Sequence, residues 1–345
     1  MIYEITFAVL FAFSLSLSFL LTPVAAGLGK RMGLVDVPGG RRKHFGAIPR
    51  TGGIAVFTAF TVPALLLFVI PRGWLPPRFD PKEPVRLLGL LIGGTIIFLA
   101  GLADDRYDLS PKVQLAVQTA VGALSVPFLI IIQRVNNPLT NRQVVFPWPI
   151  VVALTVFWIV GMVNTVNFLD GLDGLATGVG AILCAILTIH MLRQGQTSVA
   201  IVTLIMLGAA IGFLPHNFHP ARVFLGSNGS YFLGYSLGAL GIIAGAKVAT
   251  VLAVMSLPIL DVAWLIWRRW RARRSPMSAD RWHFHYRLQD LGFSQRQIVL
   301  GYYLYSAAAG ALALGISTRL YKLLALLTLG AIVSLAILWA EKAQK

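Results

Sequence analysis

Long apolar segments alternate with short polar segments from one end of the chain to the other. Each is close to the roughly 20 residues that a helix needs to cross a bilayer. The first follows a single charged residue, Glu4, and is too long for a cleaved signal peptide, so we expect it to remain as a helix. The eleven segments cover residues 5–29, 52–71, 86–103, 113–133, 148–166, 175–192, 197–214, 231–246, 248–267, 298–316 and 321–340.

The composition agrees with this pattern and excludes other classes of protein. Hydrophobic residues make up 57% of the 345 residues and charged residues only 12%, whereas an average soluble domain has about 25% charged residues. Intrinsic disorder requires low hydrophobicity, and a disulfide framework requires more than the single cysteine, Cys184. We therefore predict an all-α membrane protein with about 11 transmembrane helices, formed by one domain over residues 1–345.

The net charge of +16 would suggest nucleic acid binding in a soluble protein. In a membrane protein, the positive-inside rule and anionic lipid headgroups explain it first, and an anionic substrate is a third explanation. Of the 29 Lys and Arg residues, 19 fall on the side of the odd-numbered loops and ten on the other side. We expect the N-terminus outside, the C-terminus in the cytoplasm, a plasma (inner) membrane location and no nucleic acid partner.

Most of the few acidic residues also fall on the predicted cytoplasmic side. Membrane orientation depends on Lys and Arg rather than on acids, so this clustering calls for another explanation. One explanation is a site that binds a metal ion and an anion. The ten acids on that side are Asp36, Asp104, Asp105, Asp108, Asp170, Asp173, Asp261, Asp280, Asp290 and Glu341.

The third apolar segment ends in the sequence DDRYDLSPK. If the helix continues, Asp104 and Asp108 share a face and Asp105 points about 100° away. Carboxylate and phosphate oxygens are the ligands that Mg²⁺ takes in proteins. The alternative is a solvated loop in which Arg106 and Lys112 form salt bridges with these acids.

A second polar sequence, NTVNFLDGLDGL, joins the fifth and sixth segments. Asn164, Asn167, Asp170 and Asp173 recur every three residues and would form one polar stripe on a helix. A polar, glycine-broken helix end at membrane depth is tolerated where it lines a cavity. The alternative is a polar contact between helices.

Two further sequences carry polar groups. GSNGS, over 226–230, precedes the eighth segment; Ser230 would cap that helix, whose N-terminus suits an anion, or the sequence is a turn with a cap. The loop over 268–297 has eight Lys and Arg residues, which bind phosphate or mark topology. Topology does not explain His283 and His285, which face the same way in an extended segment.

Several smaller features complete the pattern. Asp261 lies inside the ninth segment, where an ionisable residue suggests function or pairing. The glycine-rich basic loop over 30–51 suits lipid headgroups or phosphate equally. We expect a short hairpin or loop over 134–147. Close helix packing is expected at the small-xxx-small pairs Gly89/Gly93, Gly234/Gly238 and Gly241/Gly245.

Apart from the 134–147 segment, the polar loops described above lie on one predicted face. Residues from them therefore form, we expect, a cytoplasmic active site with Mg²⁺ and a phosphorylated substrate. The loops concerned are 30–51, 104–112, 167–174, 215–230 and 268–297.

The sequences DDRYDLSPK, NTVNFLDGLDGL, GLVDVP…RRKH…PRTGG and SPMSADRWHFHYRL occur in this order. From about Gly33 to Leu288, the chain resembles the polyprenyl-phosphate N-acetylhexosamine-1-phosphate transferases, which start bacterial envelope glycans such as O-antigen and teichoic acid linkage units. The resemblance implies transfer of a sugar 1-phosphate, GlcNAc 1-phosphate being the first choice, from a UDP-sugar to polyprenyl phosphate with release of UMP. It implies Mg²⁺, with Mn²⁺ as a substitute, and leaves a homodimer open.

The resemblance also assigns roles to residues. It implies catalysis by Asp104, Asp105, Asp173, His283 and His285. It implies substrate binding by Lys43, His44, Arg50, Asp108, Asn164, Asp170 and Arg281. It implies metal ligands at Asp105, Asn167 and Ser227.

Two positions depart from the family pattern. The family usually has Gly-Asp-x-Gly-Ser where this chain has Ser227, and a hydroxyl is a poorer Mg²⁺ ligand than a carboxylate. The family often has a second adjacent histidine where this chain has Tyr286. A weakened or non-catalytic scaffold that binds polyprenyl phosphate or a nucleotide-sugar is therefore the alternative function. A transporter is disfavoured because its site would lie at mid-membrane.

Overall fold

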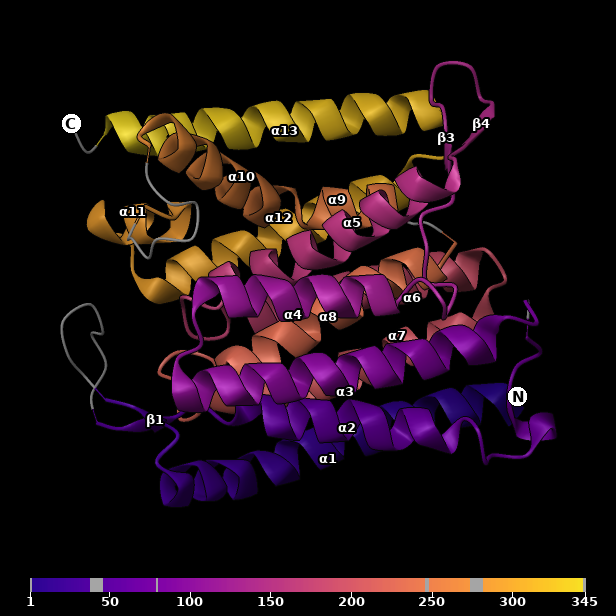
Figure 1. Cartoon of the computed structure of the whole chain (residues 1–345), viewed down its shortest axis with the longest axis horizontal. Helices are drawn as coiled ribbons and strands as arrows, with labels where there is room; N and C mark the ends of the chain where they lie inside the picture. The colour runs from indigo at the N-terminus through magenta and orange to yellow at the C-terminus, as the bar shows by residue number, and fades with distance from the viewer. Residues whose placement is uncertain (1, 38–45, 79, 246–247, 274–281, 344–345) are drawn as a thin grey trace.

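The chain forms a bundle of side-by-side helices in the computed structural model, which describes residues 2–37, 46–78, 80–245, 248–273 and 282–343 (Figure 1). The two termini lie at opposite ends of the bundle. The helices are α1 (Ile2–Met32), α2 (Gly52–Leu66), α3 (Glu83–Tyr107), α4 (Pro111–Leu124), α5 (Trp148–Leu169), α6 (Leu175–Arg193), α7 (Thr197–Asn217), α8 (Gly226–Ile243), α9 (Val248–Val254), α10 (Ser256–Arg271), α11 (Phe284–Asp290), α12 (Gln295–Gly315) and α13 (Arg319–Lys342), with a 3-10 turn η1 (Arg72–Trp74).

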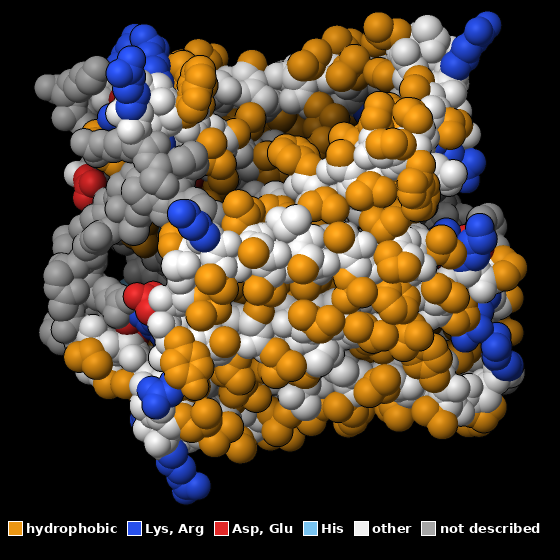
Figure 2. Space-filling view, viewed as in Figure 1, with side chains coloured by type: hydrophobic (Ala, Val, Ile, Leu, Met, Phe, Trp, Pro, Cys, Tyr) orange, Lys and Arg blue, Asp and Glu red, His pale blue; other side chains and the backbone are white. Residues whose placement is uncertain are grey.

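The all-α membrane class is confirmed, but the count of 11 spans is not. The described residues contain seven helices that are long and apolar enough to cross a membrane, or eight with the pair α9 and α10 as one span. Figure 2 shows apolar side chains over the length of the helices and Lys and Arg gathered at their two ends. The seven are α1, α3, α5, α6, α7, α12 and α13.

The predicted helix over 248–267 is wrong in one respect, because it is broken. The axes of α9 and α10 meet at 79°. Pro258 has no N–H to donate to the carbonyl of Val254 one turn earlier. The hydroxyl of Ser256 donates instead to the carbonyl of Ala253 at 2.7 Å, which stabilises the break.

The predicted helix over 113–133 is also shorter than expected. It ends at Leu124, and the chain forms turns over 125–129 before it reaches the strands β3 (Arg134–Asn136) and β4 (Gln143–Val145). The N–H of Ile132 donates to the hydroxyl of Thr155 at 3.0 Å, which fixes this segment on α5. The antiparallel pair β3–β4 confirms the hairpin.

Helix α8 is the centre of the bundle and is buried along almost its whole length. It packs between α3 and α5, and glycines allow the close approach. A Cβ on Gly93 would lie 2.1 Å from the hydroxyl of Tyr235, and one on Gly234 would lie 2.7 Å from the Cα of Val163. The close-packing prediction is confirmed there, whereas Gly245 has φ +78° and forms the turn after α8.

Candidate active site

The carboxylate of Asp105, in the last turn of α3, receives the N-terminus of α8. The backbone N–H groups of Ser227 and Asn228 donate to its two oxygens at 3.0 and 2.9 Å, and the side-chain amide of Asn228 donates as well. The first N–H groups of a helix have no partner inside the helix and carry a partial positive charge. A carboxylate there is therefore held in one orientation by a rigid element.

A glycine allows this contact. Gly101 lies one turn before Asp105 on α3, and a Cβ there would lie 2.4 Å from the carbonyl oxygen of Ser227. Any larger residue would push α3 away from the start of α8. The structure thus explains why the acid follows a glycine at this spacing.

Asp170 brings a second carboxylate to the same place. It ends α5 and is half-buried, and the backbone N–H of Gly226 helps to hold it. Burial, and then the negative charges of Asp105 and Asp173, raise the pKa of Asp170 well above its usual range. Carboxylates that repel each other in this way suit a bound cation.

Asp173 is joined to a residue that the sequence did not single out. Its carboxylate accepts a hydrogen bond from Nδ1 of His219 at 2.8 Å and from the N–H of Ala221 at 3.1 Å. His219 belongs to the segment before α8. The two histidines of that segment, His216 and His219, are the sequence signal that could have indicated this contact. The turn after α5 is therefore tied to the turn after α7.

The polar stripe on α5 makes contacts with neighbouring helices. The side-chain amide of Asn164 donates to the side-chain oxygen of Gln118 on α4. The side-chain oxygen of Asn167 accepts from the hydroxyl of Ser230 at 2.9 Å. The prediction that Ser230 caps α8 is wrong, because the helix already begins at Gly226. Asn164 and Asn167 thus fix α5 to α4 and α8 beside the carboxylates.

Helix α3 continues beyond the predicted span through Asp104 and Asp105, but it stops before Asp108. The helix ends at Tyr107, and Asp108 is exposed in the left-handed conformation with φ 51°. Asp104 accepts instead from the side chain of Gln114 at 2.9 Å and the N–H of Leu109 at 3.1 Å. Asp104 and Asp108 therefore do not share a helix face.

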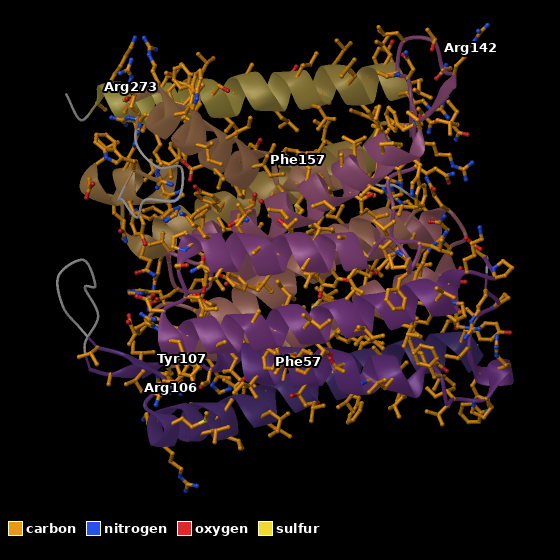
Figure 3. The ribbon with its side chains drawn as sticks, viewed as in Figure 1. Phe57, Arg106, Tyr107, Arg142, Phe157 and Arg273 are labelled. Carbon is orange, nitrogen blue, oxygen red and sulfur yellow. The ribbon has the colours of Figure 1, made fainter. Side chains whose placement is uncertain are left out.

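The solvated-loop alternative is not supported either. Neither Arg106 nor Lys112 forms an ion pair within the described part of the chain. In Figure 3, Arg106 and Tyr107 mark the end of α3, which lies at the same end of the bundle as the C-terminus.

The two histidines stack on each other beside the turn that follows α5. Their ring centroids are 5.3 Å apart with an interplanar angle of 11°. Nδ1 of His283 contacts the carboxylate of Asp261 at 3.0 Å, so the predicted role of Asp261 as a pairing residue is confirmed. His285 packs against Gly171, and the hydroxyl of Tyr286 donates to the carbonyl of Gly171 at 3.2 Å. The histidines therefore adjoin the Asp170 turn.

His285 is 1% exposed, and neither of its ring nitrogens has a hydrogen-bond partner among the residues that the structure describes. Burial, and then the charge of His283, hold the pKa of His285 well below its usual range. The ring is therefore neutral at pH 7. A buried imidazole whose nitrogens have no partner calls for an explanation, and a ligand at the site is one.

The C-terminal helix, α13, contacts the segment that carries His283 and His285. Glu341 on α13 forms ion pairs with Arg268 at 3.3 Å and with the buried Arg287 at 3.8 Å. The Arg268 guanidinium also stacks over the Trp282 ring, 3.5 Å from its centroid. These contacts connect α10, α11 and α13.

Of the predicted basic residues, the structure places one. Arg50 forms an ion pair with Asp36, and its backbone carbonyl accepts from the side chain of Asn228 at 2.8 Å. The first loop thus reaches the start of α8. Lys43, His44 and Arg281 lie outside the described residues.

The donor set fits a hard cation that brings ligands of its own. Within the described ranges, no group of three or more His, Cys, Asp or Glu side chains is placed to hold a metal. Mg²⁺ commonly takes one or two carboxylates and completes its octahedron with water and phosphate oxygens. Asp105 and Asp170 supply two such carboxylates. Ser227 lies at the start of α8 between Gly226, whose N–H helps to hold Asp170, and Asn228, whose N–H donates to Asp105.

Comparison with known proteins places this arrangement among related chains. Residues 87–245 match the family described as "Glycosyl transferase family 4", a range that includes Asp105, Asp170 and His219 but not His283 or His285. The chain is 31% identical over 306 residues to "Probable undecaprenyl-phosphate N-acetylglucosaminyl 1-phosphate transferase" of Bacillus subtilis (strain 168), covering 87% of this chain and 82% of the relative. It is 31% identical over 323 residues to "Decaprenyl-phosphate N-acetylglucosaminephosphotransferase" of Mycolicibacterium smegmatis, covering 85% and 77%.

A third relative is "Undecaprenyl-phosphate alpha-N-acetylglucosaminyl 1-phosphate transferase" of Escherichia coli (strain K12). It is 29% identical over 302 residues, which cover 84% of this chain and 77% of the relative. The three matches extend well beyond residues 87–245, so the similarity covers most of the bundle.

Proposed function

Because this chain belongs to the polyprenyl-phosphate N-acetylhexosamine-1-phosphate transferase family, we propose that it transfers N-acetylhexosamine 1-phosphate from a UDP-sugar to undecaprenyl phosphate. GlcNAc 1-phosphate is the first choice, since the relatives' names specify N-acetylglucosamine. The structural observation that carries the proposal is the pair Asp105 and Asp170 at the N-terminus of α8. This pair suits a cation bound to phosphate.

The proposed reaction exchanges one phosphoanhydride bond for another. An oxygen of the lipid phosphate attacks the β-phosphorus of the UDP-sugar, the bond from this phosphorus to the bridging oxygen breaks, and UMP leaves. In phosphoryl transfer the protein contributes mainly position and charge compensation. Direct attack and a route through an aspartyl phosphate are both consistent with this balance.

Asp105 and Asp170 are the residues that would hold Mg²⁺, with Asn167 and Ser227 as further oxygen donors nearby. Mg²⁺, or Mn²⁺ in its place, would neutralise the diphosphate charge. Three hydrogen bonds fix the carboxylate of Asp105, so this side chain would hold the cation in a defined position.

The remaining residues would bind and orient the substrates. His283 has its Nδ1 engaged by Asp261, so its Nε2 is left to contact a diphosphate oxygen. His285 adjoins it, and both of its ring nitrogens are buried and have no partner among the described residues. Asp104 and Asp173 would orient the lipid phosphate and the nucleotide, and Lys43, His44, Arg50, Asn164, Asp108 and Arg281 would contribute to substrate binding.

The membrane arrangement supports a site on one face. Counting α2, α4, α8 and the bent α9–α10 pair as crossings gives 11 spans, which agrees with termini at opposite ends of the bundle (Figure 1). With more Lys and Arg at the site end, that end is cytoplasmic and the membrane is the plasma (inner) membrane.

The test is UMP release by the purified, detergent-solubilised protein with undecaprenyl phosphate, Mg²⁺ and a panel of UDP-sugars. We expect release with UDP-GlcNAc that is lost in Asp105→Asn and retained in the matched variant Asp80→Asn, whose acid pairs with Arg86 at the other end of the bundle. No release with any sugar would contradict the proposal, and binding without turnover would favour the scaffold alternative.

A further inference from the structure

A large cavity lies at the end of the bundle opposite the Asp105 site. Its volume is about 1050 Å³, and it is lined by the segment before the β3–β4 hairpin and by parts of α5, α6, α8, α9 and α13. Figure 2 shows the surface hollowed between α13 and α5. Its lining is mainly apolar, with side chains such as Ile132, Ile243 and Leu326, and polar side chains such as Gln133 and His190 lie among them.

Basic residues surround this cavity, and no Asp or Glu lines it among the described residues. The predicted outer side has only ten Lys and Arg residues, and five of them gather here. The positive-inside tendency would instead keep such charges scarce on this side. The five are Lys82, Arg86, Arg134, Arg319 and Lys322.

Three of these cations already have protein partners. Arg86 pairs with Asp80 at 2.8 Å, Arg134 donates to Gln143, and Arg319 donates to the carbonyl of Asn141 at 2.9 Å. The ammonium groups of Lys82 and Lys322 form no ion pair with any described carboxylate, although the charge of Lys82 acts on Asp80. Two cations beside apolar walls are therefore left for a ligand.

The chemistry of the walls and the rim selects the ligand. A soluble anion would leave the apolar walls in water, and a zwitterionic lipid would leave the lysine charges unmatched. A second copy of this chain is a poor match, because its predicted outer side has only three acids, Glu4, Asp80 and Glu83. An anionic phospholipid satisfies both parts, since its acyl chains suit the walls and its phosphate suits the lysines.

We propose that this cavity binds an anionic phospholipid from the leaflet on that side of the membrane. Its phosphate contacts the basic rim to which Lys82 and Lys322 belong, and an acyl chain follows apolar side chains of the lining such as Ile132, Leu252 and Leu326. The site is separate from the transfer reaction, so it stands or falls independently of the proposed function.

The test compares retention of phosphatidylglycerol and phosphatidylcholine by the full-length protein in native mass spectrometry. Each Lys or Arg near a membrane surface contributes about fivefold to the affinity for anionic lipid. We expect Lys82→Gln/Lys322→Gln to weaken phosphatidylglycerol binding by about 25-fold. The matched control is Arg142→Gln/Arg193→Gln, which removes two cations that do not line the cavity; Arg142 points outward from the hairpin in Figure 3.

A second pair of variants tests the apolar part without changing the charge. Ala249→Trp places an indole in the cavity, whereas Ala311→Trp places one on an exposed position of α12. We expect the first to weaken phosphatidylglycerol binding about tenfold and the second to leave it unchanged. Equal retention by the lysine variant and its control, or equal binding of phosphatidylcholine, would overturn the proposal. A change of oligomeric state without any loss of lipid would also overturn the proposal, because it would indicate an interface between copies of the chain.

Discussion

Asp261 and His283, 22 residues apart in the chain, form a buried pair in which Nδ1 of the imidazole lies 3.0 Å from the carboxylate. The second oxygen of Asp261 accepts the N–H of Phe284 at 2.8 Å, which fixes the start of α11. One carboxylate therefore sets both the orientation of the ring and the path of the backbone. A histidine held in this way presents Nε2 in a defined direction.

The first prediction concerns Asp261→Asn. An asparagine can accept the N–H of Phe284 but then directs an N–H₂ group at Nδ1, so Nδ1 can no longer donate a proton to the residue that orients the ring. We expect kcat for UMP release to fall about 10- to 100-fold, by analogy with partners that orient metal-bound histidines, with KM less affected. The pH profile of kcat should also shift, which a merely structural role would not produce. An unchanged profile and kcat would show that Asp261 does not position His283.

The sequence predicted the helical class and the hairpin, and it singled out Asp105, Asn167 and Asp170, which the structure brings to the start of α8. It did so because apolar length, turn residues and acidic clusters are local signals. It did not predict the contacts that depend on packing. The bond from His219 to Asp173 joins residues 46 positions apart, and Asn228 reaches Asp105 across 123 positions. The break between α9 and α10 was missed because apolarity continues through it, although Pro258 was a signal.

A second prediction tests whether position 227 adjoins the cation. The N–H of Ser227 donates to Asp105, so an aspartate there would place a third carboxylate beside Asp105 and Asp170. We expect Ser227→Asp to lower the Mg²⁺ concentration that gives half-maximal UMP release by about tenfold. Ser227→Asn, similar in size and uncharged, is the matched control. Identical Mg²⁺ titrations in the two variants would place this position away from the metal.

A third prediction concerns His219. Its Nδ1 lies 2.8 Å from Asp173, and replacement by alanine would remove this partner from a carboxylate beside Asp170. We expect His219→Ala to lower kcat/KM about tenfold through misplacement of Asp173, and His219→Asn, which can still donate, to recover part of the loss. The measurement is steady-state UMP release. Equal activity in wild type and both variants would limit His219 to a surface role.

A fourth prediction uses the contact of α3 with the start of α8. A Cβ at Gly101 would lie 2.4 Å from the Ser227 carbonyl, whereas one at Gly161 would meet nothing within 4 Å. We expect Gly101→Ala to lower stability by about 1–3 kcal/mol and to lower activity, because Asp105 moves from its donors. Gly161→Ala should be neutral or slightly stabilising. Equal melting temperatures of the two variants would contradict the close contact.

The last prediction follows from the neutral, buried His285. Its pKa lies well below the usual value of about 6.5 in the folded protein and near that value in the unfolded chain. Below pH 6.5 the unfolded chain therefore binds more protons than the folded protein, so stability falls as the pH decreases from about 7 toward the folded-state pKa. Replacing His285 by Gln removes this titration. We expect the loss of melting temperature between pH 7 and pH 5 to be smaller in His285→Gln than in wild type. His216→Gln, at a half-buried histidine in the last turn of α7, is the matched control. If both variants keep the full wild-type slope, His285 is not the group whose burial couples folding to pH.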